Sequence, residues 1–437
     1  MSERSVAVIG GGLAGLAAAA TAAGSGADVT MFEARPHEGG RARTTAVEGG
    51  FLFNQGPHAL YAGCLGIEVL RGFGIEPRGK RPPLRGYGRL RGRLGLLPGT
   101  PVDLFRSKLV GTRSKLQLGL AVGSPKRLAR HDARGKSMQQ WIDEQVSDAD
   151  ARALFTMVTR VATYCADLDR FAADAAVPQV LSALSDGVLY LDGGWQQLVD
   201  SLRVAADRAG VKIVAGAKVS AVERTPSGSL RVVAADVPHD ADAVVIAAGG
   251  PTHADELLAG ASAAVRGWAT SEQPIHAASL DLGMRALPVP ERRVVFGVDD
   301  PLYLSVHTPS AALAPDGGEV LHVMRYGVTG TDDPGALRAE IEDLLDDAQP
   351  GWRDEVVAEH FNRNLVVAYG RPLPGVPRPT PRVPDLDGVF VAGDWVGPDG
   401  LLADAALASA RTAGRSAAQV PSTAAASPAT PATRARS

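Results

Sequence analysis

Cysteine is scarce in this sequence, with only Cys64 and Cys165 among 437 residues. They form neither a C-x-x-C motif nor a disulfide framework, which excludes dithiol redox chemistry and favours a reducing compartment. The sequence also lacks any run of about eighteen apolar residues, so no membrane-spanning helix is expected. The first apolar strand starts by residue 6, which leaves no room for a signal peptide. These absences predict a cytoplasmic protein.

Excess positive charge is missing as well. The formal net charge is −3 at pH 7, which argues against a nucleic-acid partner, and no metal site is expected. Hydrophobic residues make up 45% and charged residues 21% of the chain, as is ordinary for a soluble globular protein. A chain of this length has room for two domains, one of which can be discontinuous.

The most informative feature that is present is a glycine motif near the start. Residues 6–9 are apolar and rich in β-branched side chains, which predicts a buried strand. Gly10, Gly12 and Gly15 follow with G-x-G-x-x-G spacing. An alanine-rich helix and a second strand come next, and that strand ends at Glu33. The glycines allow a tight turn, close approach of a pyrophosphate and close helix–strand packing, and the acid can bind a ribose. This βαβ unit predicts a dinucleotide site with its phosphates at the helix N-terminus.

Further glycine clusters follow the motif. Gly39 and Gly40 allow another close approach of backbone, and Arg41 directly after them is placed to reach cofactor phosphates. Residues 51–61 alternate in polarity and break at a Gly-Pro pair, which predicts a strand running into a turn. Near the other end, residues 389–392 predict a strand that leads into a Gly-Asp pair and a helix of small residues.

Residues 77–136 have a different character, because arginine and lysine interleave with leucine and the first part, residues 77–99, holds no acid. Basic and apolar residues together favour an anionic membrane surface. Peripheral membrane contact through residues 77–130 is therefore one hypothesis. An arginine-rich solvated hairpin with helices is the other.

The rest of the chain alternates between two patterns. Helices are predicted at 138–146 and 149–164, as an insertion outside the first sheet. Residues 242–248 form an apolar run that resumes the parallel sheet, whereas residues 276–326 alternate as in an antiparallel sheet. An acidic helix is predicted at 334–347.

Three separated motifs then agree. Residues 6–45, 242–251 and 389–414 resemble the opening, the middle strand and the C-terminal flavin motif of the FAD-dependent amine oxidase and carotenoid desaturase superfamily. The resemblance implies an α/β fold in which a Rossmann-type FAD-binding domain is interleaved with an α+β substrate domain of mixed antiparallel sheet plus helices. The FAD-binding domain would comprise 1–76, 190–270 and 365–418, and the substrate domain 77–189 and 271–364. Residues 419–437 are a low-complexity tail that is expected to be disordered.

The resemblance also assigns cofactor contacts. The pyrophosphate would lie at the first glycines, the ribose at Glu33, the adenine at Val219 and the flavin near His58 and the helix beginning at Leu402. That helix would stabilise the negative charge of a reduced flavin. No cysteine lies near the C-terminal motif, so FAD is expected to be noncovalent, and no second G-x-G-x-x-G exists for a separate NAD(P)H domain. The implied FAD-binding residues are Gly10, Gly12, Leu13, Ala14, Gly15, Glu33, Ala34, Arg35, Gly40, Arg41, Gly56, Pro57, His58, Val219, Gly393, Asp394 and Leu402.

Two departures favour the desaturase branch of the superfamily. Amine oxidases usually place a lysine near flavin N5 in the second half of the chain, but the last lysine here is Lys218. They also use an aromatic pair at the flavin, and Leu401 stands at one of those positions. The segment LLADAALASA resembles the corresponding end of phytoene desaturases instead.

The expected activity is dehydrogenation or desaturation of a small apolar or amphipathic molecule by hydride transfer to flavin, with the electron acceptor left open. Oxidation of an amine or a protoporphyrinogen-like ring is the alternative, and a non-catalytic FAD-binding scaffold is a further one. His58 and Arg371 are the candidates for substrate contact, Arg371 as the partner of an acidic substrate group.

Overall fold

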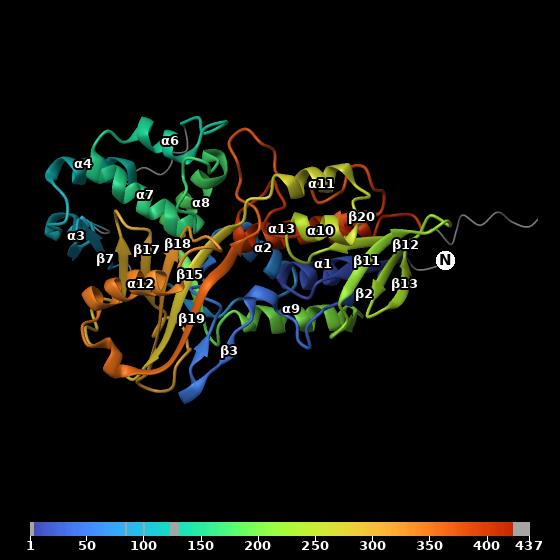
Figure 1. The fold of residues 1–437 in the computed structure, drawn as a ribbon, viewed down its shortest axis with the longest axis horizontal. Helices are drawn as coiled ribbons and strands as arrows, with labels where there is room; N and C mark the ends of the chain where they lie inside the picture. Colours follow the sequence, from blue (N-terminus) through green and yellow to red (C-terminus); the bar gives the residue numbers. More distant parts are fainter. Residues whose placement is uncertain (1–3, 84, 99–100, 123–130, 423–437) are drawn as a thin grey trace, which may run out of the picture.

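A parallel sheet forms the centre of one half of the molecule (Figure 1). The computed structural model describes residues 4–83, 85–98, 101–122 and 131–422. The strand order is β10-β2-β1-β14-β20, and all four pairings are parallel. The strands are β1 (Arg4–Ile9), β2 (Ala27–Phe32), β10 (Lys212–Val214), β14 (Ala243–Ile246) and β20 (Val389–Val391). Their near-continuous apolar composition is what a sheet covered on both faces requires.

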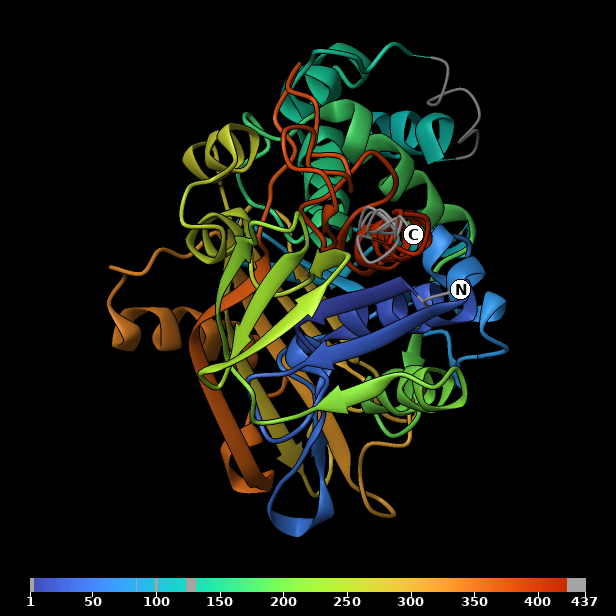
Figure 2. The same cartoon turned by 90° about the vertical axis from the view of Figure 1, so that its right-hand side faces the viewer.

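The two faces of this sheet carry different layers. Alternate strand residues such as Val6 and Val245 pack against helices α1 (Leu13–Gly24), α9 (Gln196–Arg208) and α13 (Leu402–Ala417). Their neighbours, such as Ala7 and Val244, pack against a smaller antiparallel sheet and two helices. Figure 2 shows that smaller sheet, in green, beside the blue N-terminal strands. The second layer consists of β11 (Val219–Arg224), β12 (Leu230–Ala234), β13 (Val237–Ala241), α10 (Pro251–Leu257) and α11 (Ala263–Thr270).

Small residues let helices α1 and α13 approach closely. A Cβ added to Gly414 of α13 would lie 2.5 Å from the Ala18 carbonyl oxygen of α1. A Cβ added to Gly15 would lie 1.7 Å from the Gly10 carbonyl oxygen, so α1 also rests directly on the end of β1. These contacts tie the first helix of the chain to the last one that the structure describes.

The other half of the molecule is built on a mixed sheet, to the left in Figure 1. Its order is β19-β15-β18-β17-β16-β7-β8, and every pairing is antiparallel except β16 with β7. Helix α12 (Pro334–Ala348) covers one face through Leu337, Ile341 and Leu344. The strands are β7 (Tyr87–Leu90), β8 (Arg93–Leu96), β15 (Ile275–Met284), β16 (Val294–Gly297), β17 (Leu302–Val306), β18 (Glu319–Tyr326) and β19 (Val356–Ala368).

Helices from the middle of the chain cover the top of this half (Figure 1). They are α3 (Pro101–Arg106), α4 (Thr112–Val122), α6 (Met138–Gln145), α7 (Ala149–Thr163) and α8 (Ala173–Ser185). Helix α6 begins with a capping box between Ser137 and Gln140, and Asp148 caps α7. The shorter elements are β3 (Thr45–Ala46), β4 (Leu52–Phe53), β5 (Leu60–Tyr61), α2 (Leu65–Gly72), β6 (Gly79–Lys80) and β9 (Val188–Leu191).

The predicted α/β fold with an interleaved α+β part is confirmed. Two of the expected segment boundaries fall inside strands: 189/190 divides β9 and 364/365 divides β19. Residues 365–368 thus continue the strand that pairs with β15 in the mixed sheet. Of the tail expected to be disordered, residues 423–437 lie outside the described residues.

The basic segment 77–130 is only partly a solvated surface. Arg89 belongs to this segment, and its side chain is buried. Its guanidinium binds the carboxylates of Asp300, Asp343 and Asp347 at 2.9, 2.6 and 3.1 Å. Arg89 therefore fastens β7 to helix α12. Residues 123–130 of the segment lie outside the described residues.

Within the part of the chain that the structure describes, no helix combines the length and the apolar character needed to cross a bilayer.

The tight contact between α1 and α13 predicts a sharp contrast between two glycine-to-alanine substitutions. Gly414→Ala should lower the free energy of unfolding by about 1–3 kcal/mol, because the new methyl group meets backbone of α1. Gly24→Ala is the matched control, since a Cβ there has no atom within 4 Å, and it should leave stability unchanged or slightly raised. Urea unfolding of both variants measures the difference. Equal stability would mean that the two helices separate without cost.

Candidate active site

A cavity of about 360 Å³ lies where the two halves of the molecule meet. Its wall includes the glycine loop after β1, the loop after β2 and the start of helix α13. Strands β18 and β19 of the mixed sheet complete it through Met324 and Leu365. The cavity therefore reaches from the edge of the parallel sheet into the other half of the chain.

The glycine loop forms the wall at one end. Gly10 has φ of +103°, and a Cβ there would lie 2.8 Å from the Ala247 carbonyl oxygen, so only glycine fits. A Cβ on Gly12, in contrast, would meet no protein atom within 4 Å. Gly12 lines the cavity and precedes helix α1 as its N-cap residue. The unpaired N–H groups of that helix end thus lie next to open space that suits a phosphate.

Glu33 is fixed at the same end of the cavity. Its carboxylate accepts hydrogen bonds from the backbone N–H groups of Gly11 at 2.6 Å and Arg35 at 2.7 Å. Each oxygen keeps a free lone pair for another donor. The acid after β2 is therefore oriented beside the glycine loop, as a ribose contact requires.

An ion pair forms part of the cavity wall. Arg41 and Asp394, predicted as separate cofactor ligands, bind each other at 2.6 Å. Arg41 also donates to the Val367 carbonyl at 2.7 Å and lies over the ring of Tyr369, 4.9 Å from its centre. The backbone N–H of Tyr369 donates to the second oxygen of Asp394. This cluster joins the first segment of the chain, the end of β19 and the Gly-Asp pair.

His58 lies further along the cavity wall. Its Nδ1 is 3.0 Å from the Gly56 carbonyl oxygen, and its ring packs edge-on against Trp195 with centroids 4.9 Å apart. Burial lowers the pKa of His58 to about 4. The imidazole is therefore neutral near pH 7, so it serves as a shape and hydrogen-bonding group and not as a cation.

The far end of the cavity is apolar and aromatic. It is walled by Tyr61, Tyr164, Met324 and Leu365. The Tyr61 hydroxyl donates to the Ala162 carbonyl at 2.9 Å, and the Tyr164 hydroxyl donates to the Pro57 carbonyl at 3.2 Å. Burial raises the pKa of both phenols, so both stay protonated. With their hydroxyls occupied, the two tyrosines offer mainly ring carbon to a ligand.

Most residues that the sequence suggested lie in this wall, and a few do not. Those in the wall are Gly10, Gly12, Leu13, Ala14, Glu33, Arg35, Gly40, Arg41, Pro57, His58, Gly393, Asp394 and Leu402. Gly15, Ala34, Gly56 and Val219 lie outside it, and buried Val219 packs against the second face of the parallel sheet. For Gly15 this agrees with its packing role, because its missing Cβ makes room for the Gly10 carbonyl.

Arg371 was predicted to contact an acidic group of the substrate. In the structure its guanidinium binds the Asp167 carboxylate at 2.7 Å and the Gln273 side chain. It lies outside the cavity wall. The arginine instead joins the loop after α7 to the segment before β15.

Sequence analysis did not find several residues of the wall. They are Trp195, Tyr164, Met324 and Asp404. Trp195 follows a Gly-Gly pair whose second glycine packs against Thr44 and Asn54, and that pair was the one local signal for it. The other three carry no local signal, because each is an ordinary residue at the end of a helix or within a strand.

Comparison with known proteins bears on this geometry. The sequence profile of the flavin containing amine oxidoreductases matches residues 13–271. The chain belongs to this family. The match begins at the first residue of α1, just after the glycine loop, and runs through β2 and β14 to the end of α11.

Individual relatives point to several chemistries. A mitochondrial protoporphyrinogen oxidase of Nicotiana tabacum is 36% identical over 124 residues, 27% of this chain and 24% of the relative. A carotenoid 3,4-desaturase of Haloarcula japonica is 40% identical over 78 residues, 18% of this chain and 16% of that protein. The alignments thus span a quarter or less of these curated relatives.

Solved structures agree with the fold along nearly the whole chain. An oxidoreductase from Methanosarcina mazei has a TM-score of 0.75 at 22% identity, covering 93% of this chain and 99% of its own. A putrescine oxidase bound to putrescine has a TM-score of 0.72 at 16% identity, covering 95% and 98%. At these identities the likeness shows the fold alone.

The residues of the cavity fit the cofactor of the family. Open space faces Gly12 at a helix N-terminus, and an oriented carboxylate lies beside it. The wall then continues past the ion pair to the N-terminus of α13. A two-ended cavity of this kind suits an extended flavin dinucleotide better than a compact mononucleotide.

The open space at Gly12 predicts a substitution that affects the cofactor and spares the protein. Gly12→Val adds side-chain atoms where the structure has no neighbouring atom, so the free protein should keep its unfolding midpoint within error. Its affinity for FAD should fall by roughly 10-fold or more. Fluorescence quenching of FAD and thermal unfolding of the FAD-free protein measure the two effects. Undiminished affinity would show that the cofactor phosphates do not bind at this loop.

Burial of His58 predicts a pH effect on the FAD-free protein. Its pKa is lowered from 6.5 to about 4, so the unfolded state binds more protons in that window. The unfolding free energy should therefore fall as pH drops from 6.5 to 4. The fall should stay below about 3 kcal/mol, because the ring borders the cavity. His58→Phe should flatten this dependence in urea unfolding at several pH values. Exposed His37→Phe is the control, and an equal effect there would contradict the assignment.

Proposed function

We propose that the protein is an FAD-dependent oxidoreductase that dehydrogenates or desaturates a small, largely apolar molecule. Family membership supports the flavin chemistry. The observation that carries the substrate class is the tyrosine-walled end of the cavity, in which Tyr61, Tyr164, Met324 and Leu365 offer ring and aliphatic carbon. Apolar surface that is removed from water on binding there supplies the affinity.

Residues of the chain hold and orient the cofactor. Bound FAD would supply the two-electron acceptor for hydrogen from a C–H bond. The glycine loop and Glu33 would hold its phosphate and ribose end, and the Arg41–Asp394 pair would fix the middle. Leu402 and Ala403, at the N-terminus of α13, would meet the flavin end. The free N–H groups and dipole of this helix favour the negative charge that reduction brings.

Other side chains shape the space for the substrate. Neutral His58, held by the Gly56 carbonyl and Trp195, occupies the wall between the cofactor and the tyrosine end. The hydroxyls of Tyr61 and Tyr164 are bound to carbonyls, so neither is free to act as a base. The chain thus contributes orientation and exclusion of water, and the substrate proton is lost late.

Oxidation of a porphyrinogen-like ring or an amine is the second candidate function. The 36% identity to a protoporphyrinogen oxidase favours the ring, because such a ring is also large and mostly carbon. An amine is favoured less, because the second half of the chain lacks the lysine that amine oxidases usually place near the flavin: the last lysine is Lys218. A non-catalytic FAD-binding scaffold is the third candidate, which would be supported if no candidate substrate reduced the bound flavin.

We further propose that an apolar substrate reaches the protein from a membrane surface through residues 77–130. Leu116 of α4 and Val102 of α3 have exposed fractions of 65% and 57%. Exposed Arg106, Lys108 and Arg113 lie between and beside them. Anionic lipid headgroups complement this charge, and the exposed apolar side chains suit the boundary with the acyl chains.

Anaerobic reduction of the bound flavin distinguishes these functions. FAD-loaded protein is mixed with a polyene hydrocarbon in vesicles, a porphyrinogen or a primary amine, and the visible flavin absorbance is followed. We expect bleaching by the polyene, and faster bleaching from anionic than from neutral vesicles. Leu116→Glu should remove the difference between the two vesicle types and leave reduction by dithionite unchanged.

Each other outcome has a defined meaning. Bleaching by the amine alone would contradict the proposed substrate class, and bleaching by the porphyrinogen alone would establish the second candidate. A flavin that dithionite reduces but no candidate substrate bleaches would favour the scaffold. Failure to bind FAD at all would overturn the oxidoreductase proposal.

A further inference from the structure

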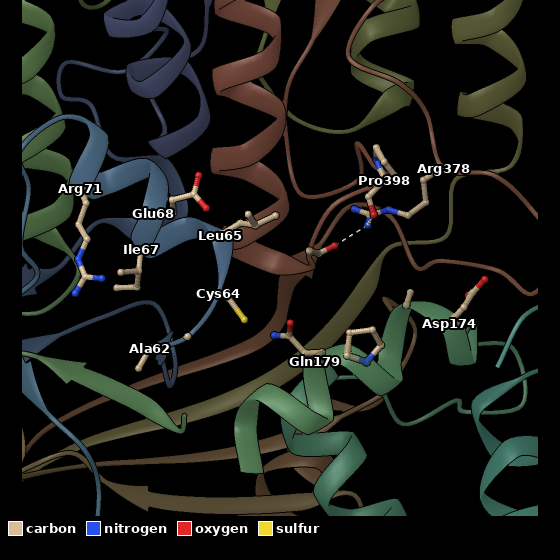
Figure 3. A pocket seen from close by; sticks show the side chains of 14 residues that line it. Ala62, Cys64, Leu65, Ile67, Glu68, Arg71, Asp174, Gln179, Arg378 and Pro398 are labelled. Carbon is tan, nitrogen blue, oxygen red and sulfur yellow. Dashed lines mark hydrogen bonds between the residues drawn. The ribbon is translucent and has the colours of Figure 1, made fainter. Parts of the chain in front are cut away.

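A second cavity lies beside the flavin cavity, and one buried acid stands between them. The second cavity has a volume of about 500 Å³ and is lined by residues of α2, α8 and the loop before α13. Figure 3 shows Cys64, Gln179 and Arg378 around it. Asp404, in the first turn of α13, lines the flavin cavity and has an exposed fraction of only 2%.

The position of the Asp404 side chain is closely defined. The Gly66 N–H of helix α2 donates to its Oδ1 at 2.7 Å. A Cβ on Gly66 would lie 2.6 Å from that same oxygen, and a Cβ on Gly400 would lie 2.7 Å from the Asp404 Cβ. Two glycines thus make room for the carboxylate, which lies at the N-termini of two helices.

Cys64 connects this carboxylate to the second cavity. Its thiol interacts with Asp404 and lies 3.0 Å from the Ser182 hydroxyl of α8. Cys64 lines the second cavity, whereas Asp404 lines the flavin cavity. Cys64 therefore lies between Asp404 and the second cavity.

We propose that Asp404 takes up a proton from the second cavity when the flavin is reduced. This inference rests on the proposed function. In a dehydrogenation, bound FAD would accept two electrons and one proton from one substrate C–H bond, and the adjacent C–H bond would release its proton to solvent as the double bond forms. A separate proton moves from solvent to a carboxylate oxygen of Asp404, which becomes a neutral carboxyl group. This uptake offsets the negative charge that reduction adds to the cavity.

Electrostatics agree with this role. Burial raises the pKa of Asp404 to about 6, against the lowering effects of the Gly66 N–H and the Cys64 thiol. The acid is therefore mostly ionised at pH 7 in the oxidised protein. Added negative charge in the same cavity raises its pKa further, which produces net proton uptake between about pH 6 and the higher value.

Arg378, Glu68 and Asp394 near Asp404 already have partners, Tyr61 remains neutral, and two further carboxylates, Asp174 and Asp186, lie on or after α8. Arg378 donates to the carbonyls of Asp394, Val396, Pro398 and Gly400. Glu68 of α2 pairs with Arg411 of α13 at 2.9 Å, and Asp394 pairs with Arg41. Tyr61 stays protonated because burial raises its pKa. Asp174 of α8 lines the second cavity, and Asp186 after α8 acts on the Cys64 thiol.

The test compares the pH dependence of the flavin midpoint potential in wild-type and Asp404→Asn holoprotein. Between about pH 6 and the raised pKa of Asp404 in the reduced protein, the wild type should take up as much as one proton more per two electrons than the variant. Glu68→Gln is the matched control, since it removes an exposed carboxylate from the same helix interface, and it should keep the wild-type dependence. An unchanged dependence in Asp404→Asn would overturn the proposal.

A second measurement needs no variant. Infrared difference spectra of wild-type holoprotein, with and without ¹³C-labelled aspartate, are recorded on reduction by dithionite. We expect a new carboxyl C=O band that shifts with the label. A flavin that is bound and reduced without this band would overturn the role of Asp404 and leave the proposed function intact. Absence of bound flavin would overturn both.

Discussion

The pairing of Arg41 with Asp394 is the contact on which the site depends. Arg41 follows the glycines after the second strand, and Asp394 follows the last strand of the parallel sheet. The same arginine binds the end of β19 through the Val367 carbonyl and the ring of Tyr369. Asp394 is almost fully buried, so removing either partner would leave an unpaired charge, which is far costlier than losing a surface ion pair.

That cluster also explains how one cavity can belong to two halves of the molecule. One wall comes from loops at the carboxyl edge of the parallel sheet, where such folds place their ligands. The apolar wall comes from β18, β19 and the loop after α7. Because β19 runs directly from the mixed sheet into the ion-pair cluster, its Leu365 is held at a fixed place relative to the glycine loop.

Sequence reasoning located residues whose positions depend on local backbone. Gly10, Gly15 and Glu33 could be placed beside one another because each contacts neighbours within one βαβ unit. The class of the second sheet followed from alternation, but its parallel pairing of β7 with β16 did not, since the two strands are far apart in the chain. The family resemblance supplied the three-segment arrangement that local patterns alone do not give.

Two arginines have partners that the sequence did not indicate. Arg371 and Arg89 are each paired with carboxylates distant in sequence, at Asp167 and at Asp300, Asp343 and Asp347. Asp404 was overlooked because an acid in the first turn of a helix has an ordinary explanation in the helix dipole. A side chain whose partner is distant in the sequence gives no recognisable pattern in the residues next to it along the chain.

The close contact of α1 with α13 has a consequence for biosynthesis. The first helix emerges from the ribosome early, but α13, whose Gly414 fits against it, is made only after both inserted segments and β20. Until then the alanine-rich face of α1 lacks a partner that covers it in the finished protein. The contact between α1 and α13 can therefore form only after nearly the whole chain has been synthesised. Contacts between residues so far apart in the sequence favour slow folding and dependence on chaperones.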